Sequence, residues 1–302
     1  FAQVYPAKTV RWIVPFPAGG GTDIIARTLA QKLAEAWGQQ VVVDNRPGSG
    51  GSLGLAAAAK SPADGYTLVL AQTANVALAP AVYAKLPYDP QTDLASVTLV
   101  LSTPFVLVAH PSIPAKNIRE LIALARARPD DLSFGSSGSG TLSHLAGEMI
   151  KTMAGVRLLH VPYKGIPLAT ADLFSGRIAL YVSPIPPMLP SVKAGRVKAI
   201  GVTGAQRSNA FPGVPTIAES GLPGYEATNW YGVMVPARTP RDVVTKLHAE
   251  LTRILQLPEV NSRFQDEGGE VTPTTPEQFS AFIGREIPKW AKIVKASGAR
   301  VD

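Results

Sequence analysis

Residues 10–38 read VRWIVPFPAGGGTDIIARTLAQKLAEAWG and contain one complete strand, turn and helix pattern. The continuous apolar run at 10–16 predicts a buried strand, and the glycine-rich segment 17–22 predicts a turn. Apolar residues at helical spacing predict a helix over 23–37 that ends at Gly38. Its buried face would contain Ile25, Leu29, Leu33 and Trp37. A strand that leads through a turn into a helix is half of a βαβ unit, which is typical of parallel sheets.

The same pattern recurs along the chain. Strands are predicted at 41–43, 67–71 and 133–135, followed by helices at 51–59, 74–83 and 141–154. Further strands are predicted at 158–161, 178–182 and 198–202, with helices at 168–174 and 188–194 between them. A strand at 229–235 precedes two helices that begin at Thr239-Pro240 and at Thr275-Pro276. We therefore expect an α/β fold with mainly parallel sheets flanked by helices.

The chain has 302 residues, which is enough for two lobes of about 150 residues each. The order of the predicted elements places residues 1–101 and 224–302 in one lobe and 102–223 in the other. The chain would then cross between the lobes at least twice, with a ligand cleft between them. We expect the C-terminal helix pair to pack on the first lobe.

Composition excludes several classes of function. The chain has no cysteine, so disulfides and thiol chemistry are absent, and its four histidines are too dispersed to indicate a metal site. The net charge of +7 comes from scattered Lys and Arg, a pattern that favours attraction of anions over nucleic-acid binding. The longest apolar stretch, 97–109, is shorter than the roughly 20 residues that a membrane-spanning helix needs. No cofactor motif is present, since neither GSG at 48–50 nor GGG at 19–21 continues into a dinucleotide fingerprint.

The first glycine-rich turn is a candidate anion site. Phe16, Gly19, Gly20 and Asp23 lie where the first strand passes into the first helix, so backbone N–H groups and the positive helix end face the carboxyl edge of the sheet. The alternative is a tight turn in which Asp23 only complements the helix dipole. The residues leave both interpretations open, and the preference of ligands for the carboxyl ends of parallel strands slightly favours binding.

The second glycine-rich turn, SSGSGT at 136–141, has the same strand-to-helix setting and adds hydroxyl groups to the backbone donors. Ser136, Ser137, Gly138 and Thr141 are therefore candidates for holding a carboxylate. The alternative is a flexible turn in which a hydroxyl caps the helix. The turn lacks the last glycine of a nucleophile elbow, so a serine hydrolase that uses Ser137 is a weaker interpretation.

Two further segments follow predicted strands and are candidates for the same site. Thr73 follows the strand at 67–71, and Lys164-Gly165 follows the strand at 158–161. Lys164 would offer a positive charge to an acidic ligand. The alternatives are a polar strand end for Thr73 and a solvated turn for Lys164, because backbone amides can hold a carboxylate without a full charge.

Several motifs in order along the chain resemble one family. They are VPFPAGG at 14–20, VVDNRPG at 42–48, ADGYTL at 63–68, VPYKG at 161–165, VPTIAE at 214–219 and WYG at 230–232. The series is similar to that of the Bug family, the solute-binding proteins of tripartite tricarboxylate transporters. The resemblance covers essentially the whole chain.

The resemblance implies a periplasmic binding protein of the Venus-flytrap type, with two α/β lobes that close on a small carboxylate-bearing acid. It implies no enzymatic activity, no cofactor or metal, a monomer, and membrane components of the transporter as partners. It also implies export with removal of a signal peptide, for which Phe1-Ala2-Gln3 would be a suitable remnant. The residues that it assigns to the site are Phe16, Gly19, Gly20, Asp23, Ser136, Ser137, Gly138 and Thr141, with Thr73, Lys164 and Gly165 in addition. A ligand-sensing receptor would share the fold.

Two positions depart from the family pattern. Ile166-Pro167 follows VPYKG where small residues are usual, and Ala179 stands where an acidic residue is common. Less polar walls favour a ligand with an apolar or aromatic body and one carboxylate over citrate.

Overall fold

A computed structural model describes residues 5–266 and 268–299, so the predicted signal-peptide remnant lies outside the described residues. These residues form two compact units. Unit 1 contains the described residues up to Ser102 together with Trp230–Lys289, and unit 2 contains Thr103–Asn229 together with the described residues from Trp290 onward. Each unit has its own sheet and its own hydrophobic core.

The sheet of unit 1 is built around strand β1 (Val10–Val14). Parallel neighbours β2 (Val41–Asn45) and β3 (Thr67–Gln72) flank it, as the two repeated strand and helix patterns predict. Antiparallel pairs then extend this sheet, between β3 and β9 (Thr228–Pro236) and between β4 (Leu94–Ala109) and β10 (Glu270–Val271). The three parallel strands all deliver their carboxyl ends to one edge, which is where the first glycine-rich turn lies.

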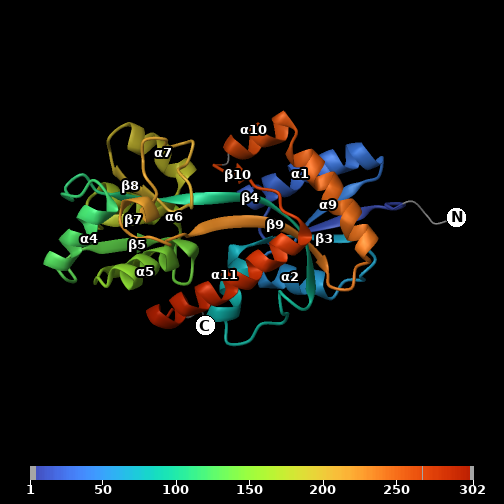
Figure 1. The fold of residues 1–302 in the computed structure, drawn as a ribbon, viewed down its shortest axis with the longest axis horizontal. Helices are drawn as coiled ribbons and strands as arrows, with labels where there is room; N and C mark the ends of the chain where they lie inside the picture. The colour runs from blue at the N-terminus through green and yellow to red at the C-terminus, as the bar shows by residue number, and fades with distance from the viewer. Residues whose placement is uncertain (1–4, 267, 300–302) are drawn as a thin grey trace. The chain divides into compact units, whose positions relative to one another are not determined.

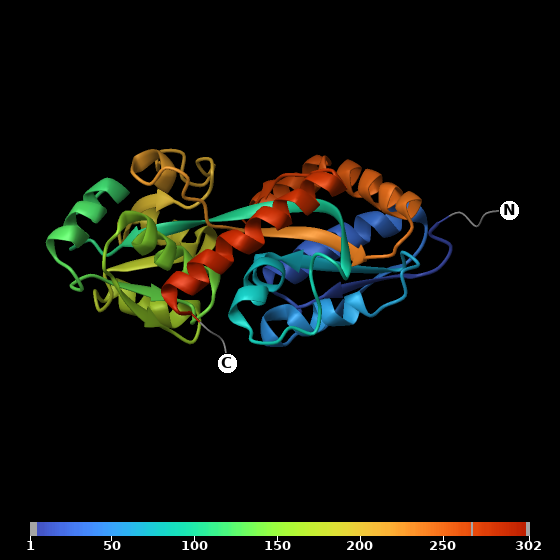
Figure 2. The same ribbon diagram turned by 60° about the horizontal axis from the view of Figure 1, so that its bottom comes forward.

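Helices cover both faces of this sheet (Figures 1 and 2). On one face α1 (Gly21–Trp37) contacts α9 (Arg241–Leu255) and α10 (Pro258–Asp266), and α2 (Ser52–Ala59) covers the other. Alternate residues of β1 belong to the core beneath α1 and α9, together with Leu29, Leu33, Leu247, Leu251 and Phe264. Helix α1 is closed by Gly38, as predicted, and Gly38 adopts the left-handed conformation that is common at this position.

Short helical turns connect the strands of unit 1. The turn η1 (Ser49–Gly51) leads into α2, and η2 (Ala74–Leu78), followed by α3 (Ala79–Val82), comes directly after β3. The segment predicted as one helix at 74–83 is therefore a π-helical turn joined to a short α-helix. This irregular turn fixes the position of Asn75, which is important for the site.

The sheet of unit 2 has β5 (Ser133–Ser136) between two parallel neighbours, β6 (Leu159–Pro162) and β7 (Leu180–Pro184). Strand β4 pairs antiparallel with β7 on one side and with β8 (Lys198–Val202) on the other. Helices α6 (Ile166–Phe174) and α7 (Ile185–Lys193) bury apolar residues on one face, and α5 (Leu142–Ala154) covers the opposite face. Helix α4 (Ile118–Ala127) contacts the short helix α8 (Ile217–Ser220).

The α/β class is confirmed, and each sheet has a parallel core of three strands to which longer strands add antiparallel pairs. Strand β4 is not among the predicted strands. Its apolar run contains Pro104, which cannot donate to a ladder and therefore argues against a continuous strand at that position. Among the described residues, no helix is long and apolar enough to cross a membrane.

The chain passes between the two units three times, within β4, within β9 and within α11 (Pro276–Ser297). The predicted division assigned all of 224–302 to the first lobe. In the structure, 224–229 and the described residues from Trp290 onward cluster with unit 2 instead. The C-terminal part of the difference arises because α11 continues as one helix through Pro288, so its last turns cluster with the second unit.

Candidate functional site

In unit 1, the turn between β1 and α1 is organised by the carboxylate of Asp23. This side chain is 3% exposed and accepts hydrogen bonds from Gly19 N at 2.9 Å, Arg27 Nε at 2.8 Å and Asn45 Nδ2 at 2.9 Å. Burial would raise the pKa of Asp23, but the hydrogen bonds from Arg27, Gly19 and Asn45 hold it below its usual range. Asp23 is therefore an ionised group that shapes the turn from within.

The backbone of the same turn is the part that faces solvent. Gly19 and Gly20 are exposed, and Gly20 is the N-cap of α1 without any side-chain capping bond. Gly19 has φ +84°, a conformation that side chains disfavour, so a glycine is required for the turn to form. Gly19 N bonds to the Asp23 carboxylate and Asp23 N bonds to Gly20 O, which leaves the N–H groups of Gly20–Thr22 without a partner among the described residues. The turn therefore presents backbone donors, as the sequence predicts.

The ring of Phe16 lies beside a polar group that the sequence patterns do not single out. A Cβ placed at Gly51 would be 2.7 Å from Asn75 Nδ2 and 3.0 Å from Phe16 Cζ, so the two side chains share the space beside this glycine. Asn75 is fully buried, and its Oδ1 accepts a hydrogen bond from Gln72 N at 2.9 Å. Its Nδ2 has no hydrogen-bond partner among the described residues.

A buried donor without a partner costs about 1–3 kcal/mol, which makes Asn75 a candidate for receiving an acceptor from a ligand. The only indication in the sequence would have been its place just after the polar end of β3. Thr73 at that strand end is itself fully buried and accepts a hydrogen bond from Trp230 N at 3.0 Å. The hydroxyl of Thr73 thus joins β9 to the end of β3.

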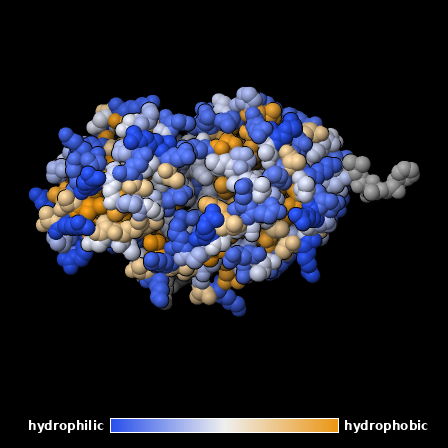
Figure 3. Space-filling view, in the orientation of Figure 1, coloured by the Kyte–Doolittle hydropathy of each residue, from blue (hydrophilic) through white to orange (hydrophobic). Residues whose placement is uncertain are grey.

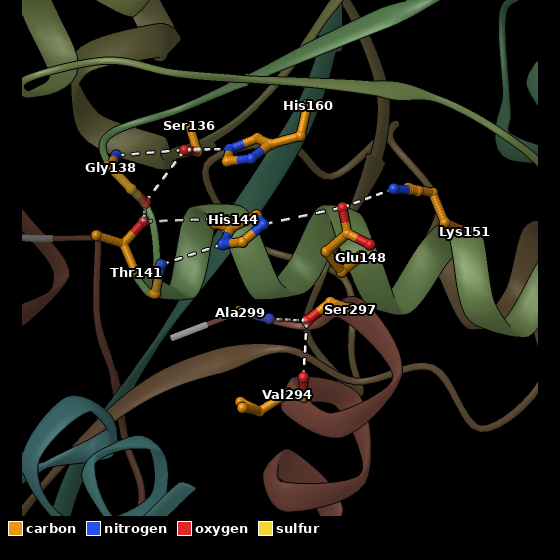
Figure 4. A network of polar contacts seen from close by, with 11 residues as sticks. Ser136, Gly138, Thr141, His144, Glu148, Lys151, His160, Val294, Ser297 and Ala299 are labelled. Carbon is orange, nitrogen blue, oxygen red and sulfur yellow. Dashed lines mark hydrogen bonds and ion pairs between the residues drawn. The ribbon is translucent and has the colours of Figure 1, made fainter. Parts of the chain in front are cut away.

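In unit 2, the second glycine-rich turn is held by its own hydroxyl groups (Figure 4). Thr141 is the N-cap of α5: its Oγ1 donates to Gly138 O at 2.7 Å and accepts from His144 N. Ser137 is partly exposed, and its hydroxyl donates to Thr141 Oγ1 at 3.4 Å. The capping interpretation of Thr141 is therefore confirmed, while Ser137 and Gly138 remain partly accessible.

Ser136 lies beneath this turn. It is fully buried, and its Oγ is 2.7 Å from His160 Nε2 and 3.1 Å from Gly138 O (Figure 4). A buried hydroxyl with these contacts supports the turn and cannot attack a substrate. The hydrolase interpretation needed a histidine beside Ser137, but the contact belongs to Ser136.

Two histidines extend the support below the turn. His144 accepts a hydrogen bond from Gly140 N through Nδ1 at 3.1 Å, and its Nε2 lies 3.8 Å from Glu148 Oε1. Burial lowers the pKa of His144 to about 4, with Lys151 as a further cause. Lys151 pairs with Glu148 at 2.7 Å, so the buried carboxylate is neutralised within α5 (Figure 4).

The segment after β6 lies next to the second turn. Gly165 N donates to Ser137 O at 3.2 Å, and Gly165 has φ +111° at the start of α6. Lys164 is exposed. The structure thus brings together Ser136–Thr141 and Lys164-Gly165 within unit 2, as it brings together the β1–α1 turn, Gly51 and Asn75 within unit 1.

Among residues 5–266 and 268–299, no group of His, Cys, Asp or Glu side chains is arranged to hold a metal ion. The donors available in both turns are backbone N–H groups, hydroxyls and amides, which suit an anion.

Comparison with known proteins decides between the classes of function that such turns allow. The model of the receptors of the tripartite tricarboxylate transporter family, TctC, matches residues 25–299. The chain belongs to this family. Protein BugT of Bordetella pertussis is 38% identical over 301 residues, which cover 99% of this chain and 92% of BugT. The family that the motifs indicated is thus confirmed.

Solved structures of TctC-type proteins agree with this membership. The structure of Rpa4515 of R. palustris with adipate is 36% identical, covers 98% of this chain and 99% of its own, and has a TM-score of 0.80. The structure of the periplasmic binding protein BugD is 35% identical, covers 98% and 99%, and has a TM-score of 0.76. This TctC-type receptor is a solute-binding protein with a periplasmic binding protein fold, and it is not an enzyme.

Proposed function

We propose that this receptor captures a small organic acid through the two glycine-rich turns and delivers it to the membrane components of a tripartite transporter. The observation that carries the proposal is the pair of strand-to-helix turns with backbone N–H groups that have no partner among the described residues, at Gly20–Thr22 in one turn and at Ser137 and Ser139 in the other. Such groups bind carboxylates without a metal or a full positive charge. The adipate in the Rpa4515 structure supports an acid as the ligand.

The proposed contacts differ in kind. Gly20 would offer its amide, Ser137 its amide and its hydroxyl, and Lys164 a charge. The N–H groups of Gly19 and Gly138 bond to Asp23 and Ser136, so these two glycines would shape the turns around the ligand. Phe16 would cover the apolar part of the ligand, with Asn75 Nδ2 next to it as an amide donor. Asp23, Thr73, Ser136 and Thr141 are engaged within the protein, and we assign them the role of holding the turns in place. Gly165 keeps the second turn close to α6.

The two apolar departures from the family pattern differ in how close they lie to the proposed binding site. Ile166 begins α6 directly after Gly165, but its half-buried side chain packs against the core of unit 2, whereas Pro167 next to it is exposed. Ala179 precedes β7 and lines a separate cavity of about 280 Å³ with His110 and Arg177, at the amino end of the strand. The glycine-rich turn lies at the carboxyl ends of the parallel strands. Only Pro167, which is exposed next to Gly165, therefore supports the preference for a ligand with a less polar body.

The proposal further places the receptor in the periplasm as an exported monomer. The deciding experiment is titration calorimetry on protein stripped of ligand by unfolding and refolding. Adipate, malate, citrate and benzoate form the panel, and adipamide is the matched control for adipate. We expect saturable binding of at least one acid, no binding of the diamide, and an unchanged acid after prolonged incubation. Equal binding of adipate and adipamide, or no binding by any acid, would overturn the proposal.

A signalling receptor of the same fold is the remaining alternative. Uptake of the bound acid by cells that carry the chain with its membrane components separates the two functions, because a sensor alone gives no uptake.

A further inference from the structure

Unit 2 carries a groove outside the glycine-rich turns. Its volume is about 580 Å³, and it lies among α4, the end of α5 and the segment that follows α8. One face of α4 forms the first wall, because positions 119, 122, 123 and 126 recur at helical spacing. Met153 and Ala154 form the second wall, and Gly221, Leu222 and Pro223 form the third.

The walls combine apolar surface with positive charge. Ile122, Ala154 and Leu222 are buried beneath the groove, whereas Met153 is 38% exposed. An exposed methionine is a flexible apolar contact of the kind that binding surfaces use. Figure 3 shows hydrophobic residues gathered at the end of unit 2 where Figure 1 places α4.

The charge on the rim is unbalanced. Among the described residues, the guanidinium of Arg119 makes no ion pair or hydrogen bond, and Arg126 donates only to Ala154 O, at the end of α5. The one carboxylate in the lining, Glu219, is already engaged by Arg207 at 3.0 Å and by Thr216 N at 3.0 Å. The groove is therefore complementary to an acidic side chain that is flanked by apolar ones.

The groove is separate from the second glycine-rich turn, but helix α5 connects the two. Helix α5 begins directly after Thr141 and ends at Ala154, so its two ends are roughly 20 Å apart along the helix axis. The turn lies at its first end and the groove at its second. A molecule bound in the groove would thus contact the same rigid helix that supports the second turn, while leaving the turn open.

We propose that this groove is a docking surface for an acidic and apolar polypeptide segment of the transporter's membrane component. The proposal rests on the function proposed above, since it names the partner of the same receptor. Charge complementarity favours this occupant, because Arg119 is an exposed arginine with an unsatisfied guanidinium beside an exposed methionine, and interfaces are enriched in both residue types.

The test is Arg119→Glu. Position 119 lies in the first turn of α4, where an acidic residue is favourable, so the substitution should not unfold the protein. Cells carrying the receptor and its membrane components would be assayed for uptake of the acid identified by calorimetry. We expect a loss of uptake on the order of tenfold at low receptor concentration, with the Kd for the acid unchanged within about twofold. Met153→Gln should reduce uptake in the same direction.

The matched control is Lys193→Glu, which makes the same change of charge on an exposed residue of unit 2 outside the groove. Uptake that is unchanged in Arg119→Glu, or lost equally in Lys193→Glu, would overturn the docking surface. If Arg119→Glu instead removes one of two calorimetric sites, the groove binds the acid itself and the polypeptide proposal is wrong. Failure of the receptor function is a separate result, because the unmodified protein would then bind no acid.

Discussion

The imidazole rings of His144 and His160 stack face to face, with centroids 3.8 Å apart and planes 11° from parallel. The ring of Phe134 also stacks on His160, with ring centroids 4.9 Å apart. Burial is the main cause that lowers the pKa of each histidine to about 4, and His144 and Lys151 disfavour a charge on His160 as well. Both rings are therefore neutral at ordinary pH, and the second turn depends on that state, since a protonated His144 could not accept from Gly140 N.

Neutral His144 predicts a specific loss of stability in mild acid. An unfolded histidine titrates near pH 6.5, so below that pH the unfolded state takes up a proton that folded His144 refuses until about pH 4. This loss of stability is absent above about pH 6.5 and grows as the pH falls. His144→Asn keeps an acceptor for Gly140 N and removes the titration. Between about pH 7 and pH 5, we expect the free energy of unfolding to fall by on the order of 2 kcal/mol more in the wild type than in the variant. Urea unfolding at the two pH values measures this, and equal losses would contradict it.

Asp23 is predicted to matter for both stability and binding. Asp23→Asn replaces an ionised acceptor of three donors with an amide that carries two hydrogens of its own. We expect a loss of about 2 kcal/mol in the free energy of unfolding, together with weaker binding of the acid because the Gly19 backbone is released. Glu35→Gln is the control on the same helix, because Glu35 is exposed and its pairing with Lys32 is screened by solvent.

The pH dependence of Asp23 separates it from the histidines. Its pKa is lowered in the folded protein, so its stabilising effect is complete above the unfolded value of about 3.9 and disappears as the pH falls through the folded pKa. Asp23→Asn should therefore leave the stability difference between about pH 7 and pH 5 unchanged. A changed difference would show that Asp23 is coupled to a histidine, contrary to the contacts described.

We predict that Asn75 Nδ2 donates a hydrogen bond to the ligand, and calorimetry can test this contact. Asn75→Asp keeps an oxygen for Gln72 N but replaces the donor Nδ2 with a second oxygen. If Nδ2 donates to the ligand, binding of the acid should weaken by at least about tenfold, because two carboxylates would face each other. Asn75→Ala separates the effect on binding from the effect on stability. It removes the acceptor of Gln72 N as well as the donor, so it should lower the stability more than Asn75→Asp does. Unchanged affinity in Asn75→Asp, with the protein folded by circular dichroism, would remove Asn75 from the site.

The sequence predicts the units of this fold better than it predicts the roles of single side chains. Local patterns, such as the run at 10–38, determine where a strand, turn and helix form, because periodicity and glycine conformation act over short distances. Whether a hydroxyl faces a ligand or supports a backbone depends on partners far along the chain. Ser136 meets His160, and Thr73 meets Trp230, through contacts that no local pattern contains. The free donor of Asn75 depends on a π-helical turn, which is equally invisible in the periodicity.

Ser136 and Ser137 are adjacent and chemically identical, yet the structure predicts opposite effects for their removal. Ser136 is fully buried against His160, so Ser136→Ala leaves buried polar atoms unpaired and should cost about 1–3 kcal/mol of stability. The hydroxyl of Ser137 has one long contact at 3.4 Å and is partly exposed. Ser137→Ala should change stability by less than about 0.5 kcal/mol and weaken acid binding by roughly two- to tenfold.

Thermal or urea unfolding and titration calorimetry on both serine variants complete this comparison. The pair acts as its own control, because each variant removes one hydroxyl from the same turn. A Ser137→Ala protein that loses stability like Ser136→Ala while binding the acid normally would assign the Ser137 hydroxyl to the support of the turn. The backbone amides at positions 137 and 139 would then remain as the anion site. Labelling of Ser137 by a serine-directed phosphonate would be inconsistent with a solute-binding site, since its hydroxyl contacts Thr141 instead of a base.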